Sequence, residues 1–171
     1  MKKIVFFTGA SCTGKSTAIK RIQKAIPESY LVSYDKLKWL QANYHRDLHK
    51  AQMKRITFGM LEVASNESPL IILDLFRPSE KEFQQIEQIA QKTHRQLITF
   101  HFMASEETIL ERFKERIASA EKAGSKVSVK DPGVFKENLN KKHYLPKEHV
   151  TINSDELSIE EMTTEILKHI N

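Results

Sequence analysis

The chain has 171 residues, with 27 lysines and arginines against 22 aspartates and glutamates, which gives a formal net charge of +5. We expect one cytoplasmic domain over residues 1–171, because no apolar run could span a bilayer and the chain begins with a strand rather than a cleavable signal. The charge suits an anionic ligand such as a nucleotide, whereas a nucleic-acid partner is only weakly indicated, since the lysines are spread along the chain. No pattern indicates an oligomeric state.

The first candidate site is a loop that fits the phosphate-binding pattern G-x-x-x-x-G-K-[ST] at every position; its residues are Gly9, Ala10, Ser11, Cys12, Thr13, Gly14, Lys15 and Ser16. The two glycines allow the tight bend that turns several N–H groups toward phosphate oxygens. In such a loop the ammonium of Lys15 reaches the β- and γ-phosphates, and the hydroxyl of Ser16 is a ligand of Mg²⁺. Thr17 follows and helps to hold the first helical turn.

The residues on both sides of this loop fit the same interpretation. Before it, the apolar run 4–7 is typical of a strand buried on both faces. After it, apolar residues at helical spacing predict an amphipathic helix that Pro27 ends. Strand, glycine loop and helix therefore occur in the order that a phosphate-binding loop requires. Cys12 is the only cysteine, which excludes an internal disulfide.

A second strand is predicted at 29–34, and Asp35 follows it. The carboxyl ends of strands border the ligand crevice in an open α/β sheet, so Asp35 is a candidate base that takes a proton from an attacking hydroxyl group. The alternative is that it only caps the next helix. A helix is expected over 36–65, where Lys36, Lys38 and Arg46 are candidates for shaping an acceptor pocket. His45 and His49 are spaced for a metal on one helix face, but we favour an exposed polar face.

The apolar run 70–73 ends at Asp74, which is the form of a Walker B strand whose aspartate holds Mg²⁺ directly or through water. A capping box at Ser79 and Glu82 then begins a helix. Arg77 lies in the loop between them, where it either touches substrate or lies on the surface. The sequence alone leaves this choice open.

A fourth strand is expected at 96–103, followed by a helix that Ser105 caps. Arg112 and Arg116 stand one turn apart on this helix. If they face the cleft, they can neutralise charge on a transferring phosphoryl group; if they face outward, they pair with neighbours such as Glu115. Both orientations remain open at this point.

The stretch 120–146 is polar and lysine-rich, which fits either a disordered insertion or part of a mobile lid over about 105–146. A fifth strand at 149–153 and a last helix, with a capping box at Ser158 and Glu161, complete the chain.

This order of motifs resembles the P-loop kinases of the polynucleotide-kinase-like and zeta-toxin-like kind, which are related to gluconate, shikimate and adenylylsulfate kinases. The resemblance runs over nearly the whole chain and is most specific in the P-loop. It implies an α/β fold, the three-layer P-loop NTPase fold, with a five-stranded parallel sheet in the order 2-3-1-4-5 and a helical lid.

The same resemblance implies ATP and Mg²⁺ as donor and a hydroxyl-bearing acceptor, either a small molecule or a polynucleotide end. Lys15 and Ser16 would then serve the donor phosphates and the metal, Asp35 the acceptor, and Arg112 with Arg116 the lid. Asn153 and Ser154 resemble the loop that such kinases place near adenine. The segment 75–78 departs from the family, because it lacks the polar Thr-Asn type signature of many polynucleotide-kinase-like members.

Three functions follow as hypotheses. The first is an ATP-dependent phosphotransferase acting on a hydroxyl group, for which Asp35 is the most distinctive residue. The second is a nucleoside-monophosphate kinase, whose phosphate acceptor needs no base. The third is a nucleotide-binding regulatory switch, although the guanine signature N-K-x-D is missing from the sequence.

Overall fold

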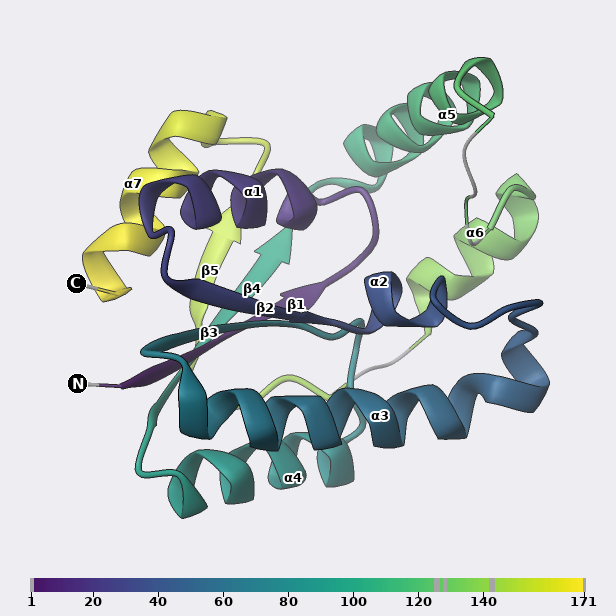
Figure 1. Ribbon diagram of the computed structural model, residues 1–171. Coiled ribbons are helices and arrows are strands. Elements are labelled where there is room, and N and C mark those ends of the chain that lie inside the picture. The colour runs from purple at the N-terminus through teal and green to yellow at the C-terminus, as the bar shows by residue number, and fades with distance from the viewer. Residues whose placement is uncertain (1, 125–126, 128, 142–143, 171) are drawn as a thin grey trace.

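The computed structural model describes residues 2–124, 127, 129–141 and 144–170, and its ribbon is drawn in Figure 1. The strands are β1 (Lys3–Gly9), β2 (Ser29–Ser33), β3 (Leu70–Asp74), β4 (Gln96–Met103) and β5 (Val150–Asn153). The helices are α1 (Lys15–Ala25), α2 (Tyr34–Lys38), α3 (Arg46–Glu67), α4 (Glu80–Lys92), α5 (Glu106–Lys122), α6 (Pro132–Asn140) and α7 (Ile159–Ile170).

The strands form one sheet of five in the order β2-β3-β1-β4-β5, and every neighbouring pair is parallel. This confirms the predicted order 2-3-1-4-5. In a parallel sheet all carboxyl ends lie at the same edge. Gly9, Ser33 and Asp74, which end β1, β2 and β3, are therefore neighbours at one edge, and Ser33 pairs in register with Asp74.

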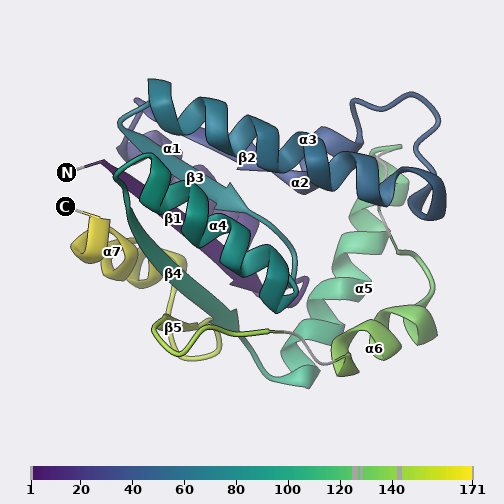
Figure 2. The same ribbon diagram turned by 90° about the horizontal axis from the view of Figure 1, so that it is seen from below.

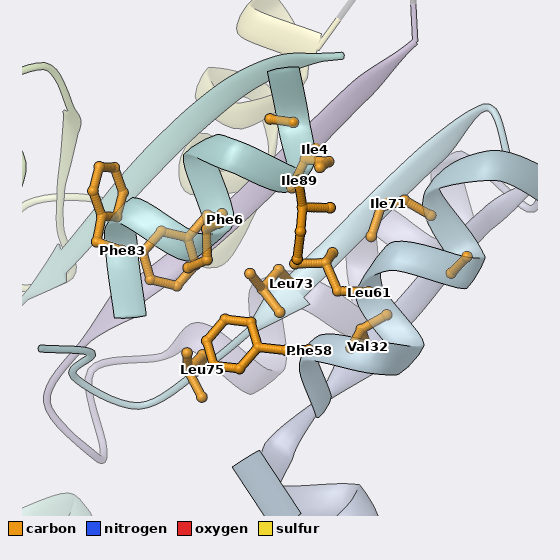
Figure 3. Close-up of a cluster of buried hydrophobic side chains, with 13 residues drawn as sticks. Ile4, Phe6, Val32, Phe58, Leu61, Ile71, Leu73, Leu75, Phe83 and Ile89 are labelled. Carbon is orange, nitrogen blue, oxygen red and sulfur yellow. The ribbon is translucent and has the colours of Figure 1, made fainter. Parts of the chain in front are cut away.

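Helices cover both faces of the sheet: α1 and α7 lie on one side, α3 and α4 on the other (Figures 1 and 2). The inner strands β1 and β3 are buried along nearly their whole length, as expected for strands that helices cover on both faces. Figure 3 shows the cluster under α3 and α4, where Phe58 and Leu61 of α3 and Phe83 of α4 meet Phe6 and Leu73 of the sheet. The α5 and α6 helices lie beyond the edge to which the strand arrows point (Figure 2).

The chain after β2 differs from the sequence prediction. The second strand ends at Ser33, so that Asp35 lies in the first turn of α2. The helix expected over 36–65 is two helices, α2 and α3, because the chain leaves the helical conformation after Trp39 and passes through a left-handed residue at Asn43, with φ of +52°. The prediction of one continuous helix was wrong here.

This break also changes the interpretation of the two histidines. His45 does not share a helix face with His49, because it precedes α3 as its N-cap residue. Its backbone N–H donates to Nδ1 of His49 at 2.9 Å. Among the described residues, no group of three or more histidine, cysteine, aspartate or glutamate side chains is placed to hold a metal ion.

The polar stretch 120–146 contains the end of α5 and the whole of α6. Asp131 caps α6, because its side chain accepts from the N–H of Val134 at 2.8 Å, and Pro132 stands at the helix start where its missing N–H costs nothing. The residues 125–126, 128 and 142–143 of this stretch lie outside the described part of the chain. Of the helices in the described part, none is long and apolar enough to cross a membrane.

Candidate active site

The loop between β1 and α1 bends through three residues with positive φ: +128° at Gly9, +66° at Cys12 and +89° at Gly14. At Gly9 a Cβ atom would lie 2.2 Å from the carbonyl oxygen of Phe102 in β4, so only glycine fits there. Gly14 is the N-cap of α1, whose first N–H groups have no partner within the helix. The loop therefore delivers a helix N-terminus, which favours anions, to the carboxyl edge of the sheet.

Lys15 turns back into this loop. Its side chain is buried, and Nζ donates to the carbonyl oxygen of Gly9 at 2.9 Å and to that of Ala10. Burial lowers the pKa of Lys15 to about 8, and the nearby carboxylates of Asp74 and Asp35 offset part of this effect. The ammonium thus lies inside the concave side of the loop, where phosphate oxygens would bring it compensating negative charge.

The two candidate carboxylates differ in their surroundings. Asp74 is half-buried at the end of β3, where Oδ2 accepts a hydrogen bond from the Ser33 hydroxyl at 2.9 Å. Burial raises the pKa of Asp74, while Lys15 and the Ser33 hydroxyl act in the opposite direction. The side chain of Asp35 is 57% exposed. A half-buried carboxylate and a more exposed one therefore lie near the same lysine.

These groups line one pocket of about 720 Å³ over the loop. Of the predicted site residues, the pocket wall contains Ser11, Cys12, Gly14, Lys15, Ser16, Thr17, Asp35, Asp74, Arg112 and Arg116. Gly9, Ala10 and Thr13 complete the loop, in which the Thr13 hydroxyl donates to the carbonyl oxygen of Ala10 at 2.8 Å. The structure brings the predicted residues to one place.

Arg112 lies in the pocket wall rather than on the outer surface. Its guanidinium donates to the carbonyl oxygen of Cys12 at 3.3 Å and to the hydroxyl of Ser154 at 2.8 Å. A further bond of 3.1 Å reaches the carbonyl oxygen of Ser154. This arginine therefore ties α5 to the phosphate loop and to the segment after β5. Arg116, one turn further along α5, lines the same pocket.

The pocket also has an apolar wall that was not predicted from the sequence, formed by Phe76, Leu157, Ile159 and Met162. The last three come from the segment between β5 and the first turn of α7, where a capping box of Ser158 and Glu161 begins the helix. Leu157 and Met162 hold the positions on either side of that box that pack together at a helix start, which is a signal that the sequence does contain. The capping box itself was predicted and is confirmed.

Helices α5 and α6 are held to each other and to the loop by a small apolar cluster. The rings of Phe113 and Phe135 stack with centroids 3.9 Å apart and planes at 15°. Ile109 and Ala10 belong to the same cluster, so the α5–α6 pair packs against the phosphate loop itself. The stretch expected to be a lid therefore contacts the site through ordered helices.

Arg77, which the sequence left unassigned, lies between the site and α6. Its backbone has φ of +41°, and its guanidinium donates to the carbonyl oxygen of Asn138 and, at 3.2 Å, to that of Leu139. These carbonyls belong to the last turn of α6, where the helix supplies no partner of its own. A positive charge is favourable at a helix C-terminus. Arg77 therefore anchors α6 to the loop that follows β3.

We expect Arg77→Met to loosen α6 without disturbing the sheet. Charge-assisted bonds to two carbonyls are worth about 2 kcal/mol in total, so amide protons of α6 should exchange roughly 30-fold faster. Hydrogen exchange measured by mass spectrometry tests this, with Arg55→Met, an exposed arginine of α3, as the matched control. Unchanged protection of α6 in Arg77→Met would contradict the anchoring role.

Comparison with known proteins found a matching family. A family model described as AAA domain matches residues 4–131. A search of curated proteins found no significant match.

Several solved structures share the fold. A proposed kinase from Chloroflexus aurantiacus superposes with a TM-score of 0.76 at 13% identity, covering 99% of this chain and 99% of that one. The Mycobacterium tuberculosis APS kinase CysC, solved with AMPPNP and APS, gives 0.70 at 15% identity, with 99% and 97% covered. A gluconokinase from Sinorhizobium meliloti gives 0.63 at 13% identity, with 98% and 90% covered. The chain belongs to the AAA domain family and has the P-loop fold that these kinases share.

Proposed function

We propose that this protein is an ATP-dependent phosphotransferase that moves the γ-phosphoryl group to a hydroxyl acceptor. The observation that carries this proposal is the accessible carboxylate of Asp35, which lines the same pocket as Lys15 and the phosphate loop. A pocket that only bound a nucleotide would need no exposed carboxylate there. A hydroxyl acceptor needs a base within reach of its proton, and Asp35 supplies one.

The residues of the pocket divide into a donor side and an acceptor side. On the donor side, the loop N–H groups and Lys15 hold the phosphates, and Arg112 with Arg116 neutralises charge that develops during transfer. The apolar side chains of Leu157, Ile159 and Met162 suit a nucleotide base. The Mycobacterium relative, whose crystals held AMPPNP and APS, supports the view that this fold accommodates a nucleotide and an acceptor together.

The oxygen atoms of Asp74 and Ser16 also suit Mg²⁺. The half-buried carboxylate of Asp74 and the hydroxyl of Ser16 line the pocket beside Lys15, and the partial loss of water around Asp74 favours a nearby positive charge, which a cation supplies. When bound there, Mg²⁺ neutralises charge on the β- and γ-phosphate oxygens. Mg²⁺ prefers oxygen ligands of this kind, and this preference supports the proposal that the protein uses it.

We expect Asp35→Asn to reduce acceptor-stimulated ADP formation by about 10²-fold or more, since the amide cannot take a proton from the acceptor. The assay follows ADP in the presence of Mg²⁺ with pooled acceptors: nucleic-acid 5′ ends, nucleosides, nucleoside monophosphates, sugars, sugar acids and aminoglycosides. Asp47→Asn, the same change at an exposed aspartate of α3, should keep full activity.

The assay distinguishes the alternatives. Stimulation by nucleoside monophosphates that survives Asp35→Asn would show a phosphate acceptor and a nucleoside-monophosphate kinase. Slow turnover that no pool accelerates, with tight ATP binding, would leave either a nucleotide-binding switch or an acceptor outside these pools, and a search for a protein partner would follow.

A further inference from the structure

Lys38 lies beside Asp35, the candidate base, and has no role in the phosphoryl transfer as proposed above. The α2 helix is short, and Asp35 and Lys38 lie three residues apart on it, so that Nζ of Lys38 pairs with Oδ1 of Asp35. Only 6% of the Lys38 side chain is exposed, against 57% for Asp35. A lysine buried to this degree on a surface helix is unusual, because an ammonium group loses its hydration when it is buried.

Aromatic rings surround the Lys38 ammonium. Nζ lies 5.0 Å from the ring centroid of Trp39 and 5.9 Å from that of Tyr34, and both separations allow attraction between a cation and a π face. Tyr44 braces both rings, since its hydroxyl lies 3.0 Å from that of Tyr34 and its ring meets Trp39 edge-on. The break between α2 and α3 brings Tyr44 to this place. The lysine is thus fixed by its surroundings rather than held loosely.

A fixed cation restricts the carboxylate that it pairs with. Asp35 stands on the first turn of a helix, where an exposed side chain normally rotates among several rotamers. The ion pair selects one orientation and occupies Oδ1. Because proton transfer to a base depends strongly on its position, this restriction has a direct consequence for the reaction.

We infer that Lys38 is a positioning residue, which holds Oδ1 of Asp35 so that Oδ2 takes the proton of the acceptor hydroxyl. This inference rests on the proposed function. In the step, the acceptor oxygen bonds to the γ-phosphorus and its proton passes to Oδ2. The bond from the γ-phosphorus to the bridging oxygen breaks, and its electron pair leaves with ADP. Lys38 touches none of the reacting atoms and acts through Asp35.

The test is a double-mutant cycle with the acceptor pool that stimulates turnover. The variants are Lys38→Met, Asp35→Asn and the two combined, since methionine keeps most of the apolar stem and removes the charge. We expect Lys38→Met to lower kcat about 10-fold while the KM for ATP stays within twofold. In the Asp35→Asn background, assayed at raised enzyme concentration, Lys38→Met should cost less than twofold more. Lys38→Arg, which keeps the cation, should recover part of the loss.

Two results would overturn the inference. One is an equal loss from Lys38→Met in both backgrounds, because Lys38 would then act independently of Asp35. The other is a raised KM for the acceptor with unchanged kcat, which would make Lys38 an acceptor-binding residue. A thermal unfolding midpoint and an ATP affinity close to those of the wild type establish that Lys38→Met is folded. Tyr44→Phe removes only the hydroxyl contact with Tyr34, and we expect it to lower kcat by a smaller factor.

Failure of the inference is distinguishable from failure of the proposed function. If Asp35→Asn keeps full acceptor-dependent activity, the hydroxyl-transfer proposal itself is wrong. If Asp35→Asn is inactive and Lys38→Met is not impaired, the proposed function stands and only the role of Lys38 falls.

Discussion

Gly9→Ala is expected to lower the thermal unfolding midpoint by roughly 10 °C and to abolish nucleotide binding. The added Cβ would lie 2.2 Å from the carbonyl oxygen of Phe102, and this neighbour is the backbone of a central strand, which cannot move aside. The residue also has φ of +128°, a conformation that alanine strongly disfavours. Together these effects cost about 4 kcal/mol, which corresponds to the stated shift for a chain of this size.

Gly59 of α3 supplies the matched control. It is helical, and a Cβ atom added there would meet nothing within 4 Å. Gly59→Ala should therefore raise stability by about 0.5–1 kcal/mol, because alanine is the better helix former. Differential scanning calorimetry of both variants measures the contrast. A midpoint for Gly9→Ala within 2 °C of the wild type would show that the phosphate loop can move away from β4.

The fold was largely predictable because its strands are short apolar runs separated by clear helix signals. The runs 4–7 and 70–73 fall within β1 and β3, and the capping box of Ser79 and Glu82 begins α4 as predicted. The sheet order came from a resemblance that the P-loop makes specific, rather than from any pairing preference of the strands. Local patterns in the sequence indicate where a strand or helix begins and ends along the chain. The order of the strands in the sheet depends on contacts between residues that are distant in the sequence.

The segment after β2 shows where this reasoning fails. Apolar residues at helical spacing continue from Leu37 to Ala64, and periodicity does not register a single left-handed residue such as Asn43 that interrupts the helix. The short α2 that results carries the ion pair of Asp35 and Lys38. Their three-residue spacing was visible in the sequence, but the burial of Lys38 was not, and Tyr44 reaches the rings of Tyr34 and Trp39 only because the chain bends between α2 and α3.

The contacts of Arg112 and Arg77 could not be predicted from the sequence for the same reason. Arg112 was equally compatible with the cleft and with solvent, because helical spacing gives the face of a residue only relative to its own helix. The Cys12 carbonyl and Ser154, which it contacts, are distant in sequence. Arg77 has no local signal for its role, because the helix end that it binds lies in a stretch whose composition indicated disorder as readily as structure.

Lys15→Met is expected to reduce turnover by about 10³-fold or more and yet to stabilise the nucleotide-free protein near neutral pH. The loss of turnover follows from the proposed function, in which the ammonium of Lys15 binds the β- and γ-phosphates and the variant lacks it. The gain in stability follows because burial lowers the pKa of Lys15 to about 8, so that its charged form opposes folding. Lys20→Met, which changes an exposed lysine of the same helix, should do neither.

The cost that the buried ammonium of Lys15 adds to folding falls as the pH rises. Because the pKa of Lys15 in the folded protein, about 8, lies below the ordinary value of 10.5, the unfolded chain binds more protons between these two pH values, and stability rises with pH there. From pH 7 to 9.5 this contribution amounts to roughly 2 kcal/mol in the wild type. It should be missing from Lys15→Met, so the stability advantage of the variant should shrink over the same interval. Urea unfolding of both proteins at the two pH values measures the difference, in which the contributions of groups that do not interact with Lys15 cancel; Asp74, whose pKa Lys15 lowers, is removed from the comparison by repeating it in an Asp74→Asn background. An advantage of Lys15→Met that stays constant with pH would show that the ammonium is solvated in the nucleotide-free loop, and that phosphate binding need not overcome its burial.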